Sequence, residues 1–233
     1  MKRNFSRGKS RAIVGCGADL YGPRIQEYIS LVTTLDATAL RETYPAPSER
    51  AVRKTLPALD HHMRRFISLS PFLCMGTSSD AGGDVTPRGD APGFVHVLDD
   101  RTLLIPDWPG NNRLDSLSNL ASNPRVGLLF FVPGMDETLR VNGIAEISVD
   151  PVLLRRWDVG GKHPHSALRV TVREAFLHCA KALIRSRLWK DDYKIDRSAM
   201  PPYAQMLKEQ TGVAQTTEQI QASLEDSYTN TLY

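Results

Sequence analysis

The residues best suited to chemistry lie in the segment 103–115, where an apolar run leads into a glycine, two asparagines and an arginine. Gly110 lets the backbone approach a ligand closely, and the side chains of Asn111 and Asn112 can donate hydrogen bonds. Arg113 adds a planar, permanently charged guanidinium. A helix is predicted over 114–121, and a helix start presents unpaired N–H groups with partial positive charge. The segment therefore favours a bound phosphate group, although a plain turn with asparagine caps would have the same sequence.

A second segment, residues 83–90, alternates as a half-solvated strand does. Thr86, Arg88 and Asp90 share one face. Pro87 removes a ladder hydrogen bond, which indicates an edge strand or a bulge. A flat ligand could touch the backbone of such a strand, and the alternative is an edge strand whose charges form ion pairs.

A third segment, His178–Trp189, joins basic residues to a terminal aromatic residue. This combination suits a planar, anionic ligand. The alternative is an amphipathic helix with a solvated basic face.

The motifs of several other kinds of site are absent from the sequence or wrongly spaced in it. The pairs His61-His62, His163-Pro-His165 and His178-Cys179 lack the ligand spacing of a zinc site, so no metal is expected. The sequence contains no Gly-x-Ser-x-Gly elbow, no P-loop and no Gly-x-Gly-x-x-Gly motif. Hydrolase, P-loop and Rossmann sites therefore lack support.

The elements that must position these residues are mostly short strands. Seven apolar runs separated by turn residues are predicted as strands: 72–77, 84–88, 94–98, 102–105, 125–132, 137–148 and 168–176. Their hairpin spacing favours an antiparallel barrel or sandwich over a parallel βαβ sheet.

Helices are predicted on both sides of the strands. Asp36 can cap a helix that runs through residue 40, Ser48 one over 49–56, and Thr216 one that carries Ile220, Leu224 and Tyr228 on one face. Leu59, Met63, Phe66 and Ile67 form an apolar stripe at helical spacing, and residues 175–189 look partly helical.

The composition limits the class of protein. The 233 residues are 41% hydrophobic and 24% charged, as in ordinary globular proteins. A net charge of +3 is too small to indicate nucleic-acid binding, and the positive excess lies in residues 1–24, interpreted as a flexible basic arm. The longest apolar run, Val126–Val132, is far shorter than a membrane span, and three widely spaced cysteines imply no disulfide framework. A cytoplasmic protein without membrane or nucleic-acid partners is expected.

Taken together, the motifs resemble those of the pyridoxamine 5′-phosphate oxidase-like FMN-binding proteins, and in particular an uncharacterised bacterial branch of that family. The resemblance is carried by five runs, with support from 178–181 and 185–189: 70–73, Thr86–Asp90, Leu104–Asp107, Gly110–Arg113 and Thr138–Gly143. It covers residues 25–195.

The resemblance implies a mainly β, α+β fold: an antiparallel split β-barrel that forms a homodimer with FMN at the subunit interface. Thr86, Pro87 and Arg88 would follow the flavin ring and ribityl chain, with Arg88 reaching the phosphate. Ile105, Pro106 and Asp107 would continue that wall, and Asn111, Asn112 and Arg113 would hold the phosphate. Arg185, Ser186 and Trp189 would come from the partner subunit and close over the ring.

The chain also departs from true pyridoxamine phosphate oxidases. It has Asn112-Arg113 where they have an Arg-Lys pair, and it lacks their Arg-Leu-x-Pro tail. FMN binding is therefore better supported than vitamin B6 oxidation. The expected function is a flavin-dependent oxidoreductase acting on an unidentified small molecule, and the alternative is a carrier or sensor of FMN, F420 or haem. The expected organisation is the arm at 1–24, the barrel domain with its N-terminal helices at 25–200 and a helical extension at 201–233.

Overall fold

The computed structural model describes residues 35–233, so the basic arm expected at residues 1–24 lies outside the described part of the chain. Contacts divide the chain into two units, one ending at Ser48 and one spanning Glu49–Tyr233. In the first unit, the helix predicted after Asp36 is confirmed as α2 (Ala37–Thr43). The Asp36 carboxylate accepts hydrogen bonds from the N–H groups of Thr38 and Ala39 at 2.9 and 2.8 Å.

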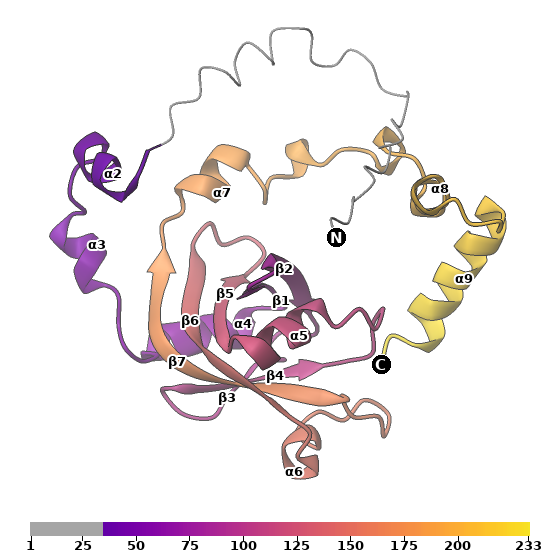
Figure 1. The fold of residues 1–233 in the computed structure, drawn as a ribbon, viewed down its shortest axis with the longest axis horizontal. Coiled ribbons are helices and arrows are strands. Elements are labelled where there is room, and N and C mark those ends of the chain that lie inside the picture. The colour runs from indigo at the N-terminus through magenta and orange to yellow at the C-terminus, as the bar shows by residue number, and fades with distance from the viewer. Residues whose placement is uncertain (1–34) are drawn as a thin grey trace, which may run out of the picture. The chain divides into compact units, whose positions relative to one another are not determined.

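The second unit is built on one seven-stranded antiparallel sheet with flanking helices, which confirms the predicted fold class. The strands are β1 (Phe72–Ser79), β2 (Gly82–Gly89), β3 (His96–Val97), β4 (Thr102–Asp107), β5 (Arg125–Phe131), β6 (Thr138–Ser148) and β7 (Ser166–His178). Their order is β2-β1-β5-β6-β7-β4-β3. The two longest strands, β6 and β7, run side by side in a long curve (Figure 1). Within the described residues β2 and β3 are the two ends of the sheet, so hydrogen bonds do not close it.

The core lies on one face of this curved sheet. Alternate residues of β1 and β5 are buried, among them Leu73, Met75 and Phe130. Helix α4 (His61–Leu69) adds the predicted apolar stripe, because Leu59, Met63, Phe66 and Ile67 are all buried in the same cluster. The Asp60 carboxylate caps α4 by accepting from the Met63 N–H at 2.8 Å.

The predicted second helix is shorter than expected. Helix α3 spans only Glu49–Arg53, because the chain then straightens and Leu56 pairs with Ala175 of β7. Two backbone hydrogen bonds of 3.0 and 2.8 Å join these residues. Local propensity is overridden here by a tertiary backbone pairing.

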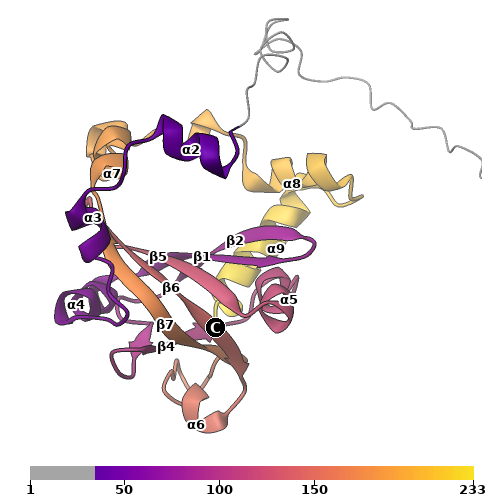
Figure 2. The same ribbon diagram turned by 60° about the vertical axis from the view of Figure 1, so that its left-hand side comes forward.

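Strand β4 leads into the site. Its residues from Thr102 to Pro106 are buried, and the loop after Asp107 ends at α5 (Asp115–Ser122), close to the predicted helix. Helix α5 lies against β1 and β2 (Figure 2). The Asn119 side chain fastens it by donating to the Thr77 hydroxyl at 3.2 Å.

The part of the chain after β6 supplies the remaining described helices. It contains α6 (Pro151–Leu154), α7 (Lys181–Ser186), the 3₁₀ turns η1 (Asp191–Tyr193) and η2 (Arg197–Ala199), α8 (Tyr203–Thr211) and α9 (Thr217–Asn230). Thr216 caps α9 as predicted, in a capping box with Gln219. In the segment predicted as partly helical, β7 continues to His178 before α7 begins. None of the helices in the described residues is both long enough and apolar enough to span a bilayer.

Candidate functional site

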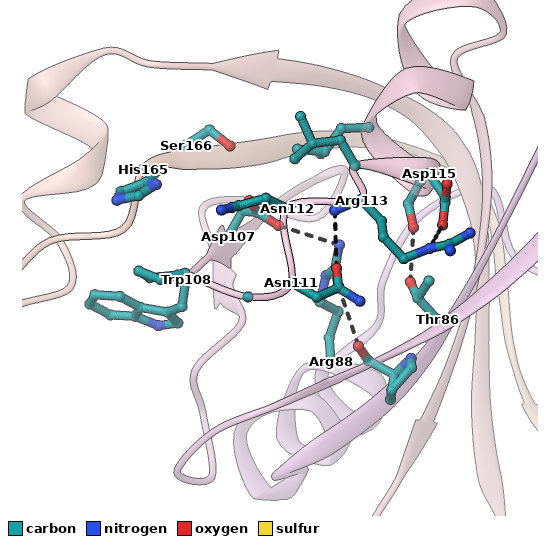
Figure 3. A pocket seen from close by; sticks show the side chains of 16 residues that line it. Thr86, Arg88, Asp107, Trp108, Asn111, Asn112, Arg113, Asp115, His165 and Ser166 are labelled. Carbon is teal, nitrogen blue, oxygen red and sulfur yellow. Dashed lines mark hydrogen bonds and ion pairs between the residues drawn. The ribbon is translucent and has the colours of Figure 1, made fainter. Parts of the chain in front are cut away.

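A cavity of about 410 Å³ opens where β2, the end of β4 and the start of α5 meet. Seven of the site residues predicted from the sequence line it: Thr86, Pro87, Arg88, Asp107, Asn111, Asn112 and Arg113. The structure thus brings together the first two chemical segments of the sequence. Figure 3 shows these side chains around the cavity, which we call the anion pocket.

The backbone of the loop before α5 is strained at two residues. Asn112 and Leu114 both have positive φ angles, of 57° and 58°. Asparagine tolerates this left-handed region better than most residues. The Asn111 side-chain oxygen accepts a hydrogen bond from the Arg113 N–H at 3.1 Å, and no side chain among the described residues caps α5. The first N–H groups of α5 therefore remain available at the pocket.

Arg113 stands at this helix start and is held by a carboxylate. Its Nε donates to Asp115 at 2.7 Å, and both side chains are well exposed. The hydrogen bond that Arg113 donates to Asp115 raises the pKa of Arg113 above its ordinary value. A phosphate at this position would compete with Asp115 for the guanidinium.

Arg88 is the most constrained basic group of the pocket. Its side chain is 24% exposed, and Nη2 lies 3.3 Å from an oxygen of Asp107. Its Nε is buried and has no hydrogen-bond partner among the described residues. Leaving a buried donor unsatisfied costs about 1–3 kcal/mol, so this atom points to an acceptor that residues 35–233 do not supply.

Asp107 is the partner of Arg88 and is itself partly buried. Burial raises the pKa of the Asp107 carboxyl, against the opposing charges of Arg88 and His165. Desolvation outweighs attraction because two positive groups do not fully replace the lost water. The carboxylate therefore takes up a proton more readily than an exposed aspartate does.

Two hydroxyl groups complete the side of the pocket nearest α5. The Ser116 hydroxyl donates to Asp84 at 3.1 Å and lies 3.0 Å from the Thr86 hydroxyl. This series of hydrogen bonds joins β2 to α5, and Thr86 lies beside the cavity.

The remaining predicted residues lie elsewhere. Ile105 is fully buried in the core, so only its backbone could serve a ligand. Pro106 lines an adjoining cavity of about 370 Å³. Arg185, Ser186 and Trp189 line neither cavity in this chain; the Trp189 indole donates to the Met135 carbonyl at 2.8 Å.

Sequence reasoning missed Trp108, His165 and Ser166 as lining residues. His165 and Ser166 reach the pocket because β7 pairs with β4, where Ser166 stands opposite Asp107. The His165 N–H also donates to the Asp107 carbonyl at 3.1 Å. Only the strand pairing could have revealed them, since they lie more than 50 residues from the loop in sequence.

The model of the pyridoxamine 5′-phosphate oxidase family matches residues 59–179, which is more than half of the chain and includes the whole anion pocket. No curated protein matches.

Several solved structures are similar over about half of this chain. HupZ of Group A Streptococcus is 15% identical, covers 51% of this chain and 93% of its own, and gives a TM-score of 0.43. A putative pyridoxamine 5′-phosphate oxidase of Lactobacillus delbrueckii is 18% identical, covers 52% of this chain and 95% of its own, and gives a TM-score of 0.41. An FMN-binding protein of Syntrophomonas wolfei is 11% identical, covers 50% of this chain and 81% of its own, and gives a TM-score of 0.38. The assignment rests on the family model, whose matched residues hold every strand of the sheet. The chain belongs to the pyridoxamine 5′-phosphate oxidase family.

Proposed function

We propose that this chain binds FMN, with the phosphate in the anion pocket, and that it acts as a flavin-dependent oxidoreductase on a small molecule. The observation that carries the proposal is the buried Arg88 Nε, which no acceptor of residues 35–233 satisfies, in a cavity lined by a second arginine. Family membership and the FMN-binding neighbour support the choice of a flavin.

The donors of the pocket fit a phosphate group. Arg88 and Arg113 offer charged N–H groups, Asn111 and Asn112 offer side-chain amides, and the start of α5 offers backbone N–H groups. Asp107 and Asp115 now hold the two arginines, so a phosphate dianion would take over these contacts. Charge-assisted hydrogen bonds are expected to hold the phosphate, and the nearby carboxylates are expected to lower its affinity.

The ring end of the nucleotide would extend along β2 and β4. Pro87, Arg88 and Asp107 line both the anion pocket and the adjoining cavity, and Pro106 lines the second. These are the strands that the family resemblance assigns to the ring. When bound, the flavin supplies the redox chemistry, and the chain binds it, orients it and shields it from water.

The proposal includes a homodimer whose partner subunit supplies Arg185, Ser186 and Trp189. These residues lie outside both cavities of their own chain. None of the ion pairs within residues 35–233 uses Arg185, so its guanidinium is free to reach an anionic ligand of a second copy.

The first test is the ligand carried by the purified protein, followed by the Arg113→Ala substitution. We expect a flavin absorption spectrum, and we expect the substitution to weaken FMN binding about 10- to 100-fold, the range for a charge-assisted hydrogen bond. Fluorescence titration of apoprotein with FMN measures both. A haem absorption band would favour the alternative carrier or sensor.

Arg53→Ala is the matched control for this substitution. Arg53 also forms an exposed ion pair, 3.0 Å from Glu49, but lies on α3 outside the anion pocket. Its loss should leave FMN affinity unchanged. Equal affinities in wild type and Arg113→Ala would refute the phosphate assignment. Turnover is tested by anaerobic bleaching with NADH or NADPH and reoxidation by candidate acceptors.

A further inference from the structure

The cavity beside the anion pocket has an aromatic wall that comes from the far end of the sequence. We call this cavity, about 370 Å³ in volume, the ring compartment. It shares Pro87, Arg88, Asp107, Trp108 and Pro109 with the anion pocket, so the two spaces adjoin along one wall. Leu232 and Tyr233, which follow α9, form its other side.

Tyr233 is attached to the site by its hydroxyl, its ring and its backbone. The hydroxyl donates to an Asp90 carboxylate oxygen at 2.8 Å. The ring meets Trp108 edge to face, with centroids 5.0 Å apart and planes at 84°. The Lys162 ammonium donates to the main-chain oxygen of Tyr233 at 2.8 Å.

Asp90 connects the two aromatic residues. One of its oxygens accepts from the Tyr233 hydroxyl and from the Ala91 N–H, and the other accepts from the Trp108 indole N–H at 3.1 Å. The hydrogen bond to Asp90 also raises the pKa of Tyr233, so the phenol remains a donor at neutral pH. The carboxylate thus fixes both rings relative to β2.

We propose that Trp108 and Tyr233, positioned by Asp90, are the aromatic walls of a subsite for the planar ring of the nucleotide. The proposal rests on the proposed function, which places a flavin phosphate in the adjoining pocket. The compartment is suited to a ring because proline and aromatic side chains dominate its lining: Pro87, Phe94, Pro106, Trp108, Pro109 and Tyr233. Aromatic rings that meet by an edge or an offset face attract one another beyond simple area burial.

The test separates the two compartments with three probes: inorganic phosphate, riboflavin and FMN, each titrated by calorimetry. Riboflavin carries the ring without the phosphate. Tyr233→Ala should weaken riboflavin and FMN by the same factor, about 3- to 10-fold, and leave phosphate affinity unchanged. Arg113→Ala should weaken phosphate and FMN and leave riboflavin unchanged.

Tyr233→Phe distinguishes the ring from its hydroxyl. It keeps the aromatic wall but removes the donor to Asp90, so riboflavin binding should weaken by less than in Tyr233→Ala. The fluorescence of bound riboflavin, which neighbouring aromatic rings quench, should rise in Tyr233→Ala and remain low in Tyr233→Phe. Tyr228→Ala is the control, because Tyr228 is an exposed tyrosine of α9 outside the ring compartment.

Four results would overturn the assignment. Unchanged riboflavin affinity in Tyr233→Ala would show that Tyr233 is not a wall, and tighter binding would show that it blocks the compartment instead. A parallel loss of phosphate affinity would show a general structural defect. If the wild type binds neither FMN nor riboflavin, the proposed function fails and this assignment fails with it; the first three results leave the proposed function intact.

Discussion

Arg88 and Asp107 show how a single residue pair can prepare a site for an anion. The pair is mostly buried. Even so, one Arg88 N–H finds no acceptor in the described part of the chain, and burial raises the pKa of Asp107. The folded protein therefore binds a proton at the Asp107 carboxyl more tightly than the unfolded chain does. At pH values above the folded-state pKa, the ionised carboxylate lowers the free energy of unfolding. That cost is relieved as the pH falls through the folded-state pKa.

Asp107→Asn should strengthen anion binding in the pocket. It removes a negative charge beside Arg88, and we expect sulfate affinity at pH 8 to rise about threefold or more. As the pH falls toward the raised pKa of Asp107, the wild-type carboxyl takes up its proton and the ratio of the two affinities should fall toward one. Calorimetric titration between pH 4.5 and 8 measures this ratio.

Sulfate is chosen because its charge does not change over this range. Asp80→Asn, in the exposed turn between β1 and β2, is the control. A ratio that stays constant with pH would contradict the role of the Asp107 carboxyl.

The β6–β7 pair is the element that carries the curvature of the sheet. Its register shifts between Asn142 and Gly143, which marks a β-bulge. A Cβ built on Gly143 would lie 2.5 Å from the Thr171 carbonyl oxygen and 3.0 Å from a Val170 methyl carbon. The bulge therefore requires glycine for its close backbone approach rather than for its φ angle.

Gly143→Ala should lower the free energy of unfolding by about 1–3 kcal/mol, because the backbone of β7 must move. Gly76→Ala is the matched control on β1, since its Cβ would meet nothing closer than the Gly127 carbonyl at 3.8 Å. Chemical denaturation of both variants gives the comparison. Equal midpoints for the two variants would mean that the bulge accommodates a methyl group.

At the scale of the whole molecule, the proposed dimer would complete each site with residues of the other copy. The pocket of one chain is lined by the groups that we propose bind the anion, and α7 with the residues after it lies outside that pocket. Whether Arg185 acts in its own chain or across an interface decides how the two sites of a dimer respond to combined substitutions.

A heterodimer of one Arg113→Ala chain and one Arg185→Ala chain tests this directly. If Arg185 acts across the interface, one of the two sites keeps both arginines, and FMN should bind at half stoichiometry with wild-type affinity. If Arg185 acts within its own chain, both sites lack one arginine and no tight site remains. Sedimentation of the purified species establishes the dimer, and a monomer would refute the proposal outright.

The sequence by itself determined the number, order and type of the strands, the helix caps and the segment that makes the anion pocket. Hairpin spacing, apolar alternation and capping residues are local signals, and Asp36 and Thr216 cap helices as predicted. The motifs around Arg88 and Arg113 are also local. The family resemblance that these motifs carry predicts that both arginines lie in one pocket.

Only the tertiary structure decided which residues distant in sequence lie beside these motifs. His165 and Ser166 reach the pocket through the β4–β7 pairing, Leu56 leaves its helix to pair with Ala175, and Tyr233 meets Asp90 across 143 positions of sequence. Such contacts depend on strand register and on the position of the residues that follow α9. Neither produces a periodic pattern in the sequence of the residues involved. For this reason the anion pocket was predictable from the sequence, whereas its neighbouring compartment was not.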